Sequence, residues 1–269
     1  MDSPSANEID IRDELLKFHS AYYSANLMKL CVLGREPLDE LEAMVKDLFS
    51  AIPNTDAPQP SFSGTPYGPE QLGHTVRFVP IKELRSLQMT WPLPPQDGNY
   101  ETKPTRYLAH LLGHEGAGSV LSVLKKEGLA DGLSAGEGSA GSDFSSFTVS
   151  IELTEEGLGR VNDVASVVFQ YVGMLQREGV SERVWAEEQD VAKMNFQFKE
   201  KEEPASATSR FAGWMQKYPA AEIFSGPYLF TKYDADVIQK VQDCLTVEAC
   251  MLTISAKEVE GETDSSEKW

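Results

Sequence analysis

The chain has 269 residues, of which 41% are hydrophobic and 25% are charged, and it contains 12 Phe, 9 Tyr and 4 Trp. This composition is that of a globular protein and excludes a disordered or fibrous chain. The 42 acidic and 24 basic residues leave a net charge of −18. That charge argues against nucleic acid or an anionic membrane as the main partner, because both attract cationic surfaces. Cationic or amine-bearing partners fit it better.

The cysteines and the absence of targeting signals suggest a compartment. Cys31, Cys244 and Cys250 are an odd number with no metal-binding spacing, and no Asn-x-Ser/Thr acceptor for glycosylation occurs. No apolar run approaches the roughly 20 residues of a membrane span, and the first ten residues do not resemble a secretory signal. We therefore expect a soluble, cytoplasmic protein with no membrane partner.

The N-terminal part of the chain predicts a helix, a strand and a second helix, in that order. Apolar residues at helical spacing predict a helix over 12–23, and the apolar run 27–33 predicts a strand. A proline opens the next predicted helix, 37–52. Five prolines and three glycines in 53–73 exclude helix interiors and central strands. We expect this segment to be a surface connection within a single domain that covers 9–269.

Beyond this connection, strands and helices alternate irregularly. Strands are predicted at 75–81 and 86–93, which a short link would join as a hairpin, and at 147–153 and 250–254. Alternation of apolar and polar residues in 147–153 indicates a sheet with one wet face. Helices are predicted at 104–112, 120–128, 154–179, 181–198, 205–217 and 234–245. A regular βαβ period is missing, so the predicted fold class is α+β, with a mixed or antiparallel sheet backed by helices.

The stretch from His110 to Gly116 contains the highest concentration of side chains that could bind a metal or another ligand. His110 and His114 are four residues apart and Glu115 follows them, which raises the possibility of a zinc site. Both the zincin motif and its inverse place the glutamate between the histidines, whereas here it comes after them. Packed histidines explain the pattern better, so we predict no catalytic residue and no metal ligand in this chain.

The same stretch suits a peptide amine better than a metal. Its glycines have no side chains that would keep a ligand backbone at a distance. Glu115 supplies a negative charge near the end of a helix. The glycine-rich segment 131–140 is an edge-strand candidate onto which an extended peptide could add by main-chain hydrogen bonds. A structural hairpin with bulges is the alternative for this segment.

A nucleotide site is not supported. The string from Gly136 to Gly141 matches G-x-G-x-x-G, but that motif must follow a strand and open a helix, and here a strand follows. His19 and His74 are isolated and no nucleophile elbow occurs, so a catalytic triad has no support either.

Four segments resemble a known family. Leu15 to Met28, Cys31 to Glu36, Gly113 to Gly116 and Leu153 to Gly157 resemble the second domain of the insulin-degrading-enzyme (insulysin) group of pitrilysin-type zinc metallopeptidases. The resemblance extends over nearly all of 9–269. It implies a pitrilysin-family metallopeptidase-like domain, one of four homologous α+β domains that enclose a chamber, with the catalytic zinc in the first domain.

The resemblance also implies a role without catalysis. The family's inverted zinc motif, His-x-x-Glu-His, does not occur here, so this chain alone should neither hold the catalytic zinc nor cleave peptides. In the family, the second domain carries an exosite that binds the amino terminus of a substrate and pairs with it as an added strand. Carried over residue by residue, the exosite corresponds here to His110, Gly113, Glu115 and Leu133, together with the altered positions Ala135 and Glu137.

Several exosite positions depart from the family pattern. Arg106 replaces a histidine, Ala109 and Ala135 replace glycines, Ser134 replaces a valine, and Glu137 replaces a glutamine. These changes put the substrate preference in question. Glu137 would add a second negative charge near Glu115, and Ala135 would narrow a close backbone approach.

The leading hypothesis is a non-catalytic domain that anchors peptide substrates at the exosite and helps to form the degradation chamber. Its partners would be peptide substrates and the catalytic and C-terminal domains of the same enzyme, and a homo-oligomer of the full-length enzyme is compatible with the resemblance. One alternative is a purely structural, chamber-forming domain. Another is an independent metalloenzyme that uses His110, His114 and Glu115.

Overall fold

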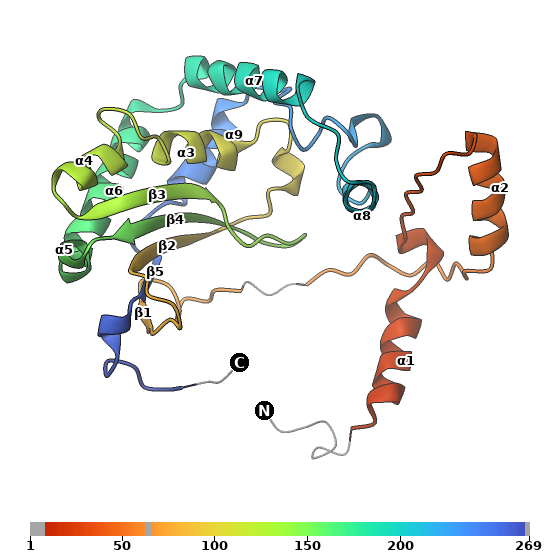
Figure 1. Ribbon diagram of the computed structural model, residues 1–269, viewed down its shortest axis with the longest axis horizontal. Helices are drawn as coiled ribbons and strands as arrows, with labels where there is room; N and C mark the ends of the chain where they lie inside the picture. Colours follow the sequence, from red (N-terminus) through yellow and green to blue (C-terminus); the bar gives the residue numbers. More distant parts are fainter. Residues whose placement is uncertain (1–8, 63–65, 267–269) are drawn as a thin grey trace. The chain divides into compact units, whose positions relative to one another are not determined.

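The computed structural model describes residues 9–62 and 66–266, which group into two compact units (Figure 1). Unit 1 consists of the described residues up to 62 together with 199–227. Unit 2 consists of the described residues from 66 to 198 together with 228–266.

The single domain predicted over 9–269 stays a prediction, and its residues 63–65 and 267–269 lie outside the described residues. The described part of the connection 53–73 contains neither helix nor strand. Its prolines lack the backbone N–H that either structure would need.

Unit 2 is built on a five-stranded mixed sheet with the order β1-β5-β2-β4-β3. β1 runs parallel to β5, and the other neighbouring pairs are antiparallel. The strands are β1 (Thr75–Phe78), β2 (Ser86–Leu93), β3 (Ala130–Glu137), β4 (Ser145–Leu153) and β5 (Met251–Ser255). The predicted α+β class with a mixed sheet is confirmed.

The predicted hairpin between 75–81 and 86–93 is wrong, although both strands exist. β5 comes from the C-terminal part of the chain, lies between β1 and β2, and pairs with both. The short link between β1 and β2 suggested that they were neighbours, but the sheet inserts a strand that is far away in sequence.

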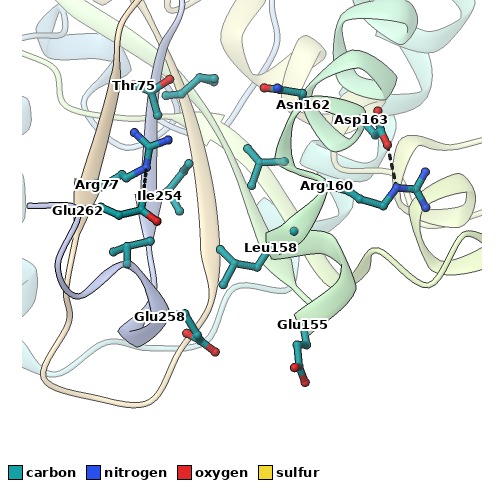
Figure 2. A pocket seen from close by; sticks show the side chains of 14 residues that line it. Thr75, Arg77, Glu155, Leu158, Arg160, Asn162, Asp163, Ile254, Glu258 and Glu262 are labelled. Atoms are coloured by element: carbon teal, nitrogen blue, oxygen red, sulfur yellow. Dashed lines mark hydrogen bonds and ion pairs between the residues drawn. The ribbon is translucent and has the colours of Figure 1, made fainter.

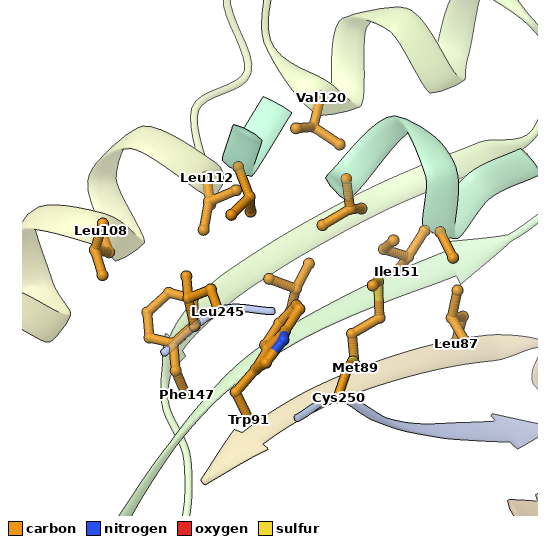
Figure 3. Close-up of a cluster of buried hydrophobic side chains, with 14 of the residues drawn as sticks. Leu87, Met89, Trp91, Leu108, Leu112, Val120, Phe147, Ile151, Leu245 and Cys250 are labelled. Atoms are coloured by element: carbon orange, nitrogen blue, oxygen red, sulfur yellow. The ribbon is translucent and has the colours of Figure 1, made fainter. Parts of the chain in front are cut away.

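The core of unit 2 lies between one face of the sheet and the helices. These are α3 (Pro104–Leu112), α4 (Val120–Lys126), α5 (Glu155–Gly159), α6 (Val161–Glu178), α7 (Glu182–Gln197) and α9 (Ala235–Asp243). In the view of Figure 1, α3, α4 and α7 lie above the sheet. Leu87, Met89 and Trp91 of β2 are fully buried on this face (Figure 3). The Trp91 indole also donates a hydrogen bond of 2.8 Å to the Thr246 carbonyl, so the largest core side chain leaves no polar atom unpaired.

The long helix predicted at 154–179 is two helices. Thr154 caps α5 by accepting a hydrogen bond from the Gly157 N–H, and the chain breaks at Arg160 before α6 begins. A Cβ at Gly157 would lie 1.9 Å from the Leu129 carbonyl oxygen, so only glycine allows this approach. The close backbone contact holds α5 separately from α6.

Unit 1 contains α1 (Ile11–Tyr22), α2 (Leu38–Phe49) and α8 (Pro204–Trp214), with the 3-10 helices η2 (Ala25–Leu27) and η4 (Ala220–Glu222). The predicted N-terminal helices are confirmed, and the Asp10 side chain caps α1. Neither α1 nor α2 has a buried residue. The apolar faces by which these helices were predicted are therefore exposed.

The strand predicted at 27–33 is wrong. The segment after η2 has no regular structure, and Val32 and Leu33 are 45% and 63% exposed. A strand exists only where a neighbour takes up its backbone hydrogen bonds. No described strand pairs with this segment.

Unit 2 contains a similar succession of a helix, a short turn and an apolar segment, formed by α9 and β5, and there the apolar segment is a strand. The Met28 N–H donates to the Ala25 carbonyl at 3.2 Å, and at the matching place before β5 the Cys250 N–H donates to the Val247 carbonyl at 3.2 Å. β5 has neighbours on both sides, whereas the segment after Met28 has none. The missing neighbour, rather than the sequence of the segment, explains the difference.

This contrast predicts hydrogen-exchange behaviour. In the chain as it stands, the amides of 29–33 should exchange at least about a hundredfold faster than those of β5, because exposed unpaired amides open without cost. Mass spectrometry of peptic fragments measures both segments in one sample. Equal protection of the two segments would contradict the unpaired state of 29–33.

Candidate functional site

The six predicted exosite residues lie on three pieces of unit 2, with α4 between the second and the third. His110 is on α3, Gly113 and Glu115 are in the loop between α3 and α4, and β3 carries Leu133, Ala135 and Glu137. β3 is an edge strand of the sheet, so its outer edge pairs with no described strand. β3 also forms a hairpin with β4 that has a register shift between Ala130 and Gly132, so the segment is both the edge strand and the irregular hairpin that were weighed for it. Peptide addition to its edge remains a proposal.

The end of α3 meets β3 at a glycine. A Cβ on Gly113 would lie 2.8 Å from the Ala109 carbonyl oxygen and 3.6 Å from the Ala135 backbone nitrogen. The contact with the Ala109 carbonyl favours glycine at the end of the helix, and the distance to Ala135 is an ordinary van der Waals contact that places the loop against the strand. The predicted open approach for a ligand backbone stays a prediction. Leu133 and Ala135 pack against the core, so their side chains face the helices, and only their backbone is at the edge.

Glu115 carries a solvent-exposed carboxylate. Among the described residues, no hydrogen bond or ion pair reaches it. A carboxylate in this situation keeps its charge available to a ligand, in contrast with one that already has a partner.

Glu137 is held by its neighbours. One carboxylate oxygen accepts a hydrogen bond from the Thr105 hydroxyl and the other accepts one from the Ser145 hydroxyl, each at 3.1 Å. Thr105 and Ser145 are themselves buried. The expected second negative charge therefore joins the start of α3 to the end of β3 and the start of β4.

The two histidines do not form a zinc site. His110 Nδ1 lies 2.9 Å from a carboxylate oxygen of Glu188 on α7, and His114 Nδ1 accepts a hydrogen bond of 3.0 Å from the Gly116 N–H. Among the residues that the structure describes, no group of three or more His, Cys, Asp or Glu side chains could hold a metal ion. The residues present do not fit the zinc of the metallopeptidase family.

Glu188 is the site residue that sequence reasoning missed. Its side chain is buried, and it shares the buried face of α7 with Trp185 and Ala192. A carboxylate on the apolar face of an amphipathic helix is unusual and would have been a usable signal, because buried charges need partners. The partner, His110, comes from a distant part of the sequence.

The described residues of unit 2 also line several hollows away from Glu115. One, of about 650 Å³, lies between β1 and the junction of α5 and α6 (Figure 2). Its charged side chains include two ion pairs: Arg77 pairs with Glu262 at 2.8 Å and Arg160 with Asp163 at 2.7 Å. Another, of about 550 Å³, lies on the sheet face opposite the core and is lined by Ser, Thr and Gln side chains, which confirms the predicted wet face.

Comparison with known proteins assigns a family. Residues 10–191 match the family model described as the peptidase M16 inactive domain, and residues 196–269 match the model of the middle or third domain of peptidase M16. The chain belongs to the M16 peptidase family. Within it, residues 10–191 correspond to a domain without catalytic activity.

Individual relatives agree with this family. The chain is 43% identical to human insulin-degrading enzyme over 99% of its own length and 26% of that protein, and 39% identical to the A-factor-processing enzyme of Saccharomyces cerevisiae over the same shares. The structure of pitrilysin matches 96% of this chain and 27% of that one with a TM-score of 0.89 at 23% identity, which confirms the pitrilysin-like fold. The M16 chain thus spans about a quarter of the length of these relatives.

No helix among the described residues is both long enough and apolar enough to cross a membrane.

The different surroundings of Glu137 and Glu115 predict that replacing them by alanine destabilises the protein to different degrees. Glu137→Ala should lower the free energy of unfolding by about 1–3 kcal/mol, because two buried hydroxyls lose their acceptor. Glu115→Ala should change it by less than about 0.5 kcal/mol, since nothing depends on an exposed, unpaired carboxylate. Urea unfolding of the two variants compares them directly, and equal losses would contradict the geometry described above.

Proposed function

We propose that this chain anchors the free amino terminus of peptide substrates for an M16 peptidase and forms part of the wall of its degradation chamber. The observation that carries the proposal is the exposed, unpaired carboxylate of Glu115, two residues after Gly113, which packs against the edge strand β3. The carboxylate would receive the α-ammonium group in a charge-assisted hydrogen bond. The following residues of the peptide would add to β3 as a further strand.

The shape of the site supports this binding mode. Gly113 adds no side chain between the loop and the strand near Ala135, and Ala135 itself turns its side chain toward the core. Main-chain hydrogen bonds do not depend on the side chains of the peptide, so peptides of many sequences could bind. The ammonium contact would then require a free first residue.

The anchor would act through effective concentration. A peptide held at one end reaches a second, distant site as an intramolecular partner, which raises its local concentration without any new chemistry. Cleavage, and the zinc that it requires in this family, would belong to the catalytic domain of the full-length enzyme. That domain and the C-terminal domains are the proposed protein partners.

A second role, as a brace between domains, is favoured by one observation. Large apolar side chains on α1 and α2, such as Leu15, Phe18 and Leu48, are more than half exposed. Apolar surface of this extent is typical of an interface. The two roles are compatible, and only the anchor predicts binding of a peptide by the chain itself.

The cytoplasmic location remains part of the proposal. Cys31, Cys244 and Cys250 are all free thiols, as a reducing compartment would leave them. Burial raises the pKa of the Cys250 thiol to about 12, so it stays protonated and unreactive.

Glu115→Gln tests the anchor. The change keeps the shape of the side chain and removes its charge, so a peptide with a free amino terminus should bind at least about tenfold more weakly, as expected for a charge-assisted hydrogen bond. The N-acetylated form of the same peptide should bind the variant and the parent chain equally. Fluorescence anisotropy with labelled peptides measures both.

Glu127→Gln is a matched control, because Glu127 is an exposed carboxylate at the C-terminal end of α4, whereas Glu115 precedes the start of that helix, and the change should leave both affinities unchanged. Equal weakening of the free and acetylated peptides by Glu115→Gln would remove Glu115 from the anchor role. Absence of any peptide binding by the chain would leave the brace as its function.

A further inference from the structure

Arg106 is a partly exposed cation on the face of α3 that continues toward Glu115. Arg106, His110 and Gly113 are spaced i, i+4 and i+7, so they share one face of the helix and continue into the loop that carries Glu115. All three residues are partly exposed. This face is flanked by Glu188 of α7 on one side and by β3 on the other.

The charges along this face are separated. No ion pair joins Arg106 to a described carboxylate, and its guanidinium lies 5.4 Å from the centre of the buried Phe230 ring, which fixes its position. Glu137, the carboxylate on the neighbouring strand, is occupied by Thr105 and Ser145. Arg106 near the start of α3 and Glu115 beyond its end therefore both lack an ion-pair partner among the described residues, while Glu137 keeps its negative charge beside the first turn.

The surroundings of Lys103 support this picture. Burial and the nearby charge of Arg106 lower the pKa of Lys103 to about 8, while Glu137 opposes the shift. Two cations thus share the first turn of α3, where the helix dipole is also positive. Glu137 from β3 also faces this turn, and Glu188 pairs with His110 one turn further along α3.

We propose that Arg106 is a specificity-determining residue of the peptide anchor and selects substrates with an Asp or Glu side chain a few residues after their free amino terminus. This inference rests on the proposed anchoring function and adds a substrate class to it. Arg106 and Gly113 are seven residues apart, which is about 10 Å along a helix. An extended peptide covers that length in about three residues, at about 3.3 Å each. With its ammonium group at Glu115, the acidic side chain would be at about the fourth position.

The test uses the whole chain and a pair of otherwise neutral ten-residue peptides with Glu or Gln at the fourth position, each with a free and an acetylated amino terminus. The parent chain should bind the free Glu peptide about three- to fivefold more tightly than the free Gln peptide, the range of a partly exposed ion pair. Arg106→Gln should reduce this ratio to one, and Arg106→Lys should keep most of it. High salt should lower the ratio in the parent chain.

Arg177→Gln is the matched control, because Arg177 is exposed in the last turn of α6 and should leave the ratio unchanged. A thermal unfolding curve for each variant shows whether loss of the Phe230 contact affects the fold, and Arg106→Lys keeps the test valid if Arg106→Gln unfolds.

The outcomes separate the two proposals. A Glu to Gln ratio that stays the same in Arg106→Gln, or that is one in the parent chain, overturns the role of Arg106 while preference for the free over the acetylated terminus still supports the anchor. Loss of that preference, or no binding at all, overturns both.

Discussion

The packing of the end of α3 against the edge strand β3 is the contact on which the candidate site depends. Gly113 ends the helix where a Cβ would come within 2.8 Å of the Ala109 carbonyl oxygen, and it lies in van der Waals range of Ala135 on the strand. At the other end of the helix, Glu137 connects β3 to the buried hydroxyls of Thr105 and Ser145. Since β3 has a neighbour on one side only, these contacts hold the strand in place and leave its outer edge open. A rigid open edge is what strand addition requires.

Glu137 and Glu115 carry the same carboxylate, but within the described part of the chain the first is hydrogen-bonded by its neighbours and the second is not. Glu137 satisfies two buried donors, so its charge serves the fold, whereas Glu115 is exposed and has no partner among the described residues. The −18 net charge of the chain therefore says little about the site itself. The position of each carboxylate relative to buried donors decides whether it binds a ligand or stabilises the protein.

Unit 1 shows how far a local pattern depends on its neighbours. Its helices have the expected apolar stripes and a normal cap, yet no residue of α1 or α2 is buried. Its apolar segment after η2 resembles the approach to β5 down to one backbone hydrogen bond and still forms no strand. Helices satisfy their own backbone groups and survive alone, whereas a strand needs another strand.

The sequence by itself determined the elements whose signals are local. The strand Ser86–Leu93 and the helix Pro104–Leu112 match their predictions, and the α+β class and the M16 family follow from patterns and motifs along the chain. Only the tertiary structure decided that β5 separates β1 from β2, that Glu188 pairs with His110, and that Glu137 is bound while Glu115 is not. These are contacts between residues far apart in sequence. No periodicity along the chain encodes such contacts, because they depend on which surfaces meet when the core of unit 2 closes.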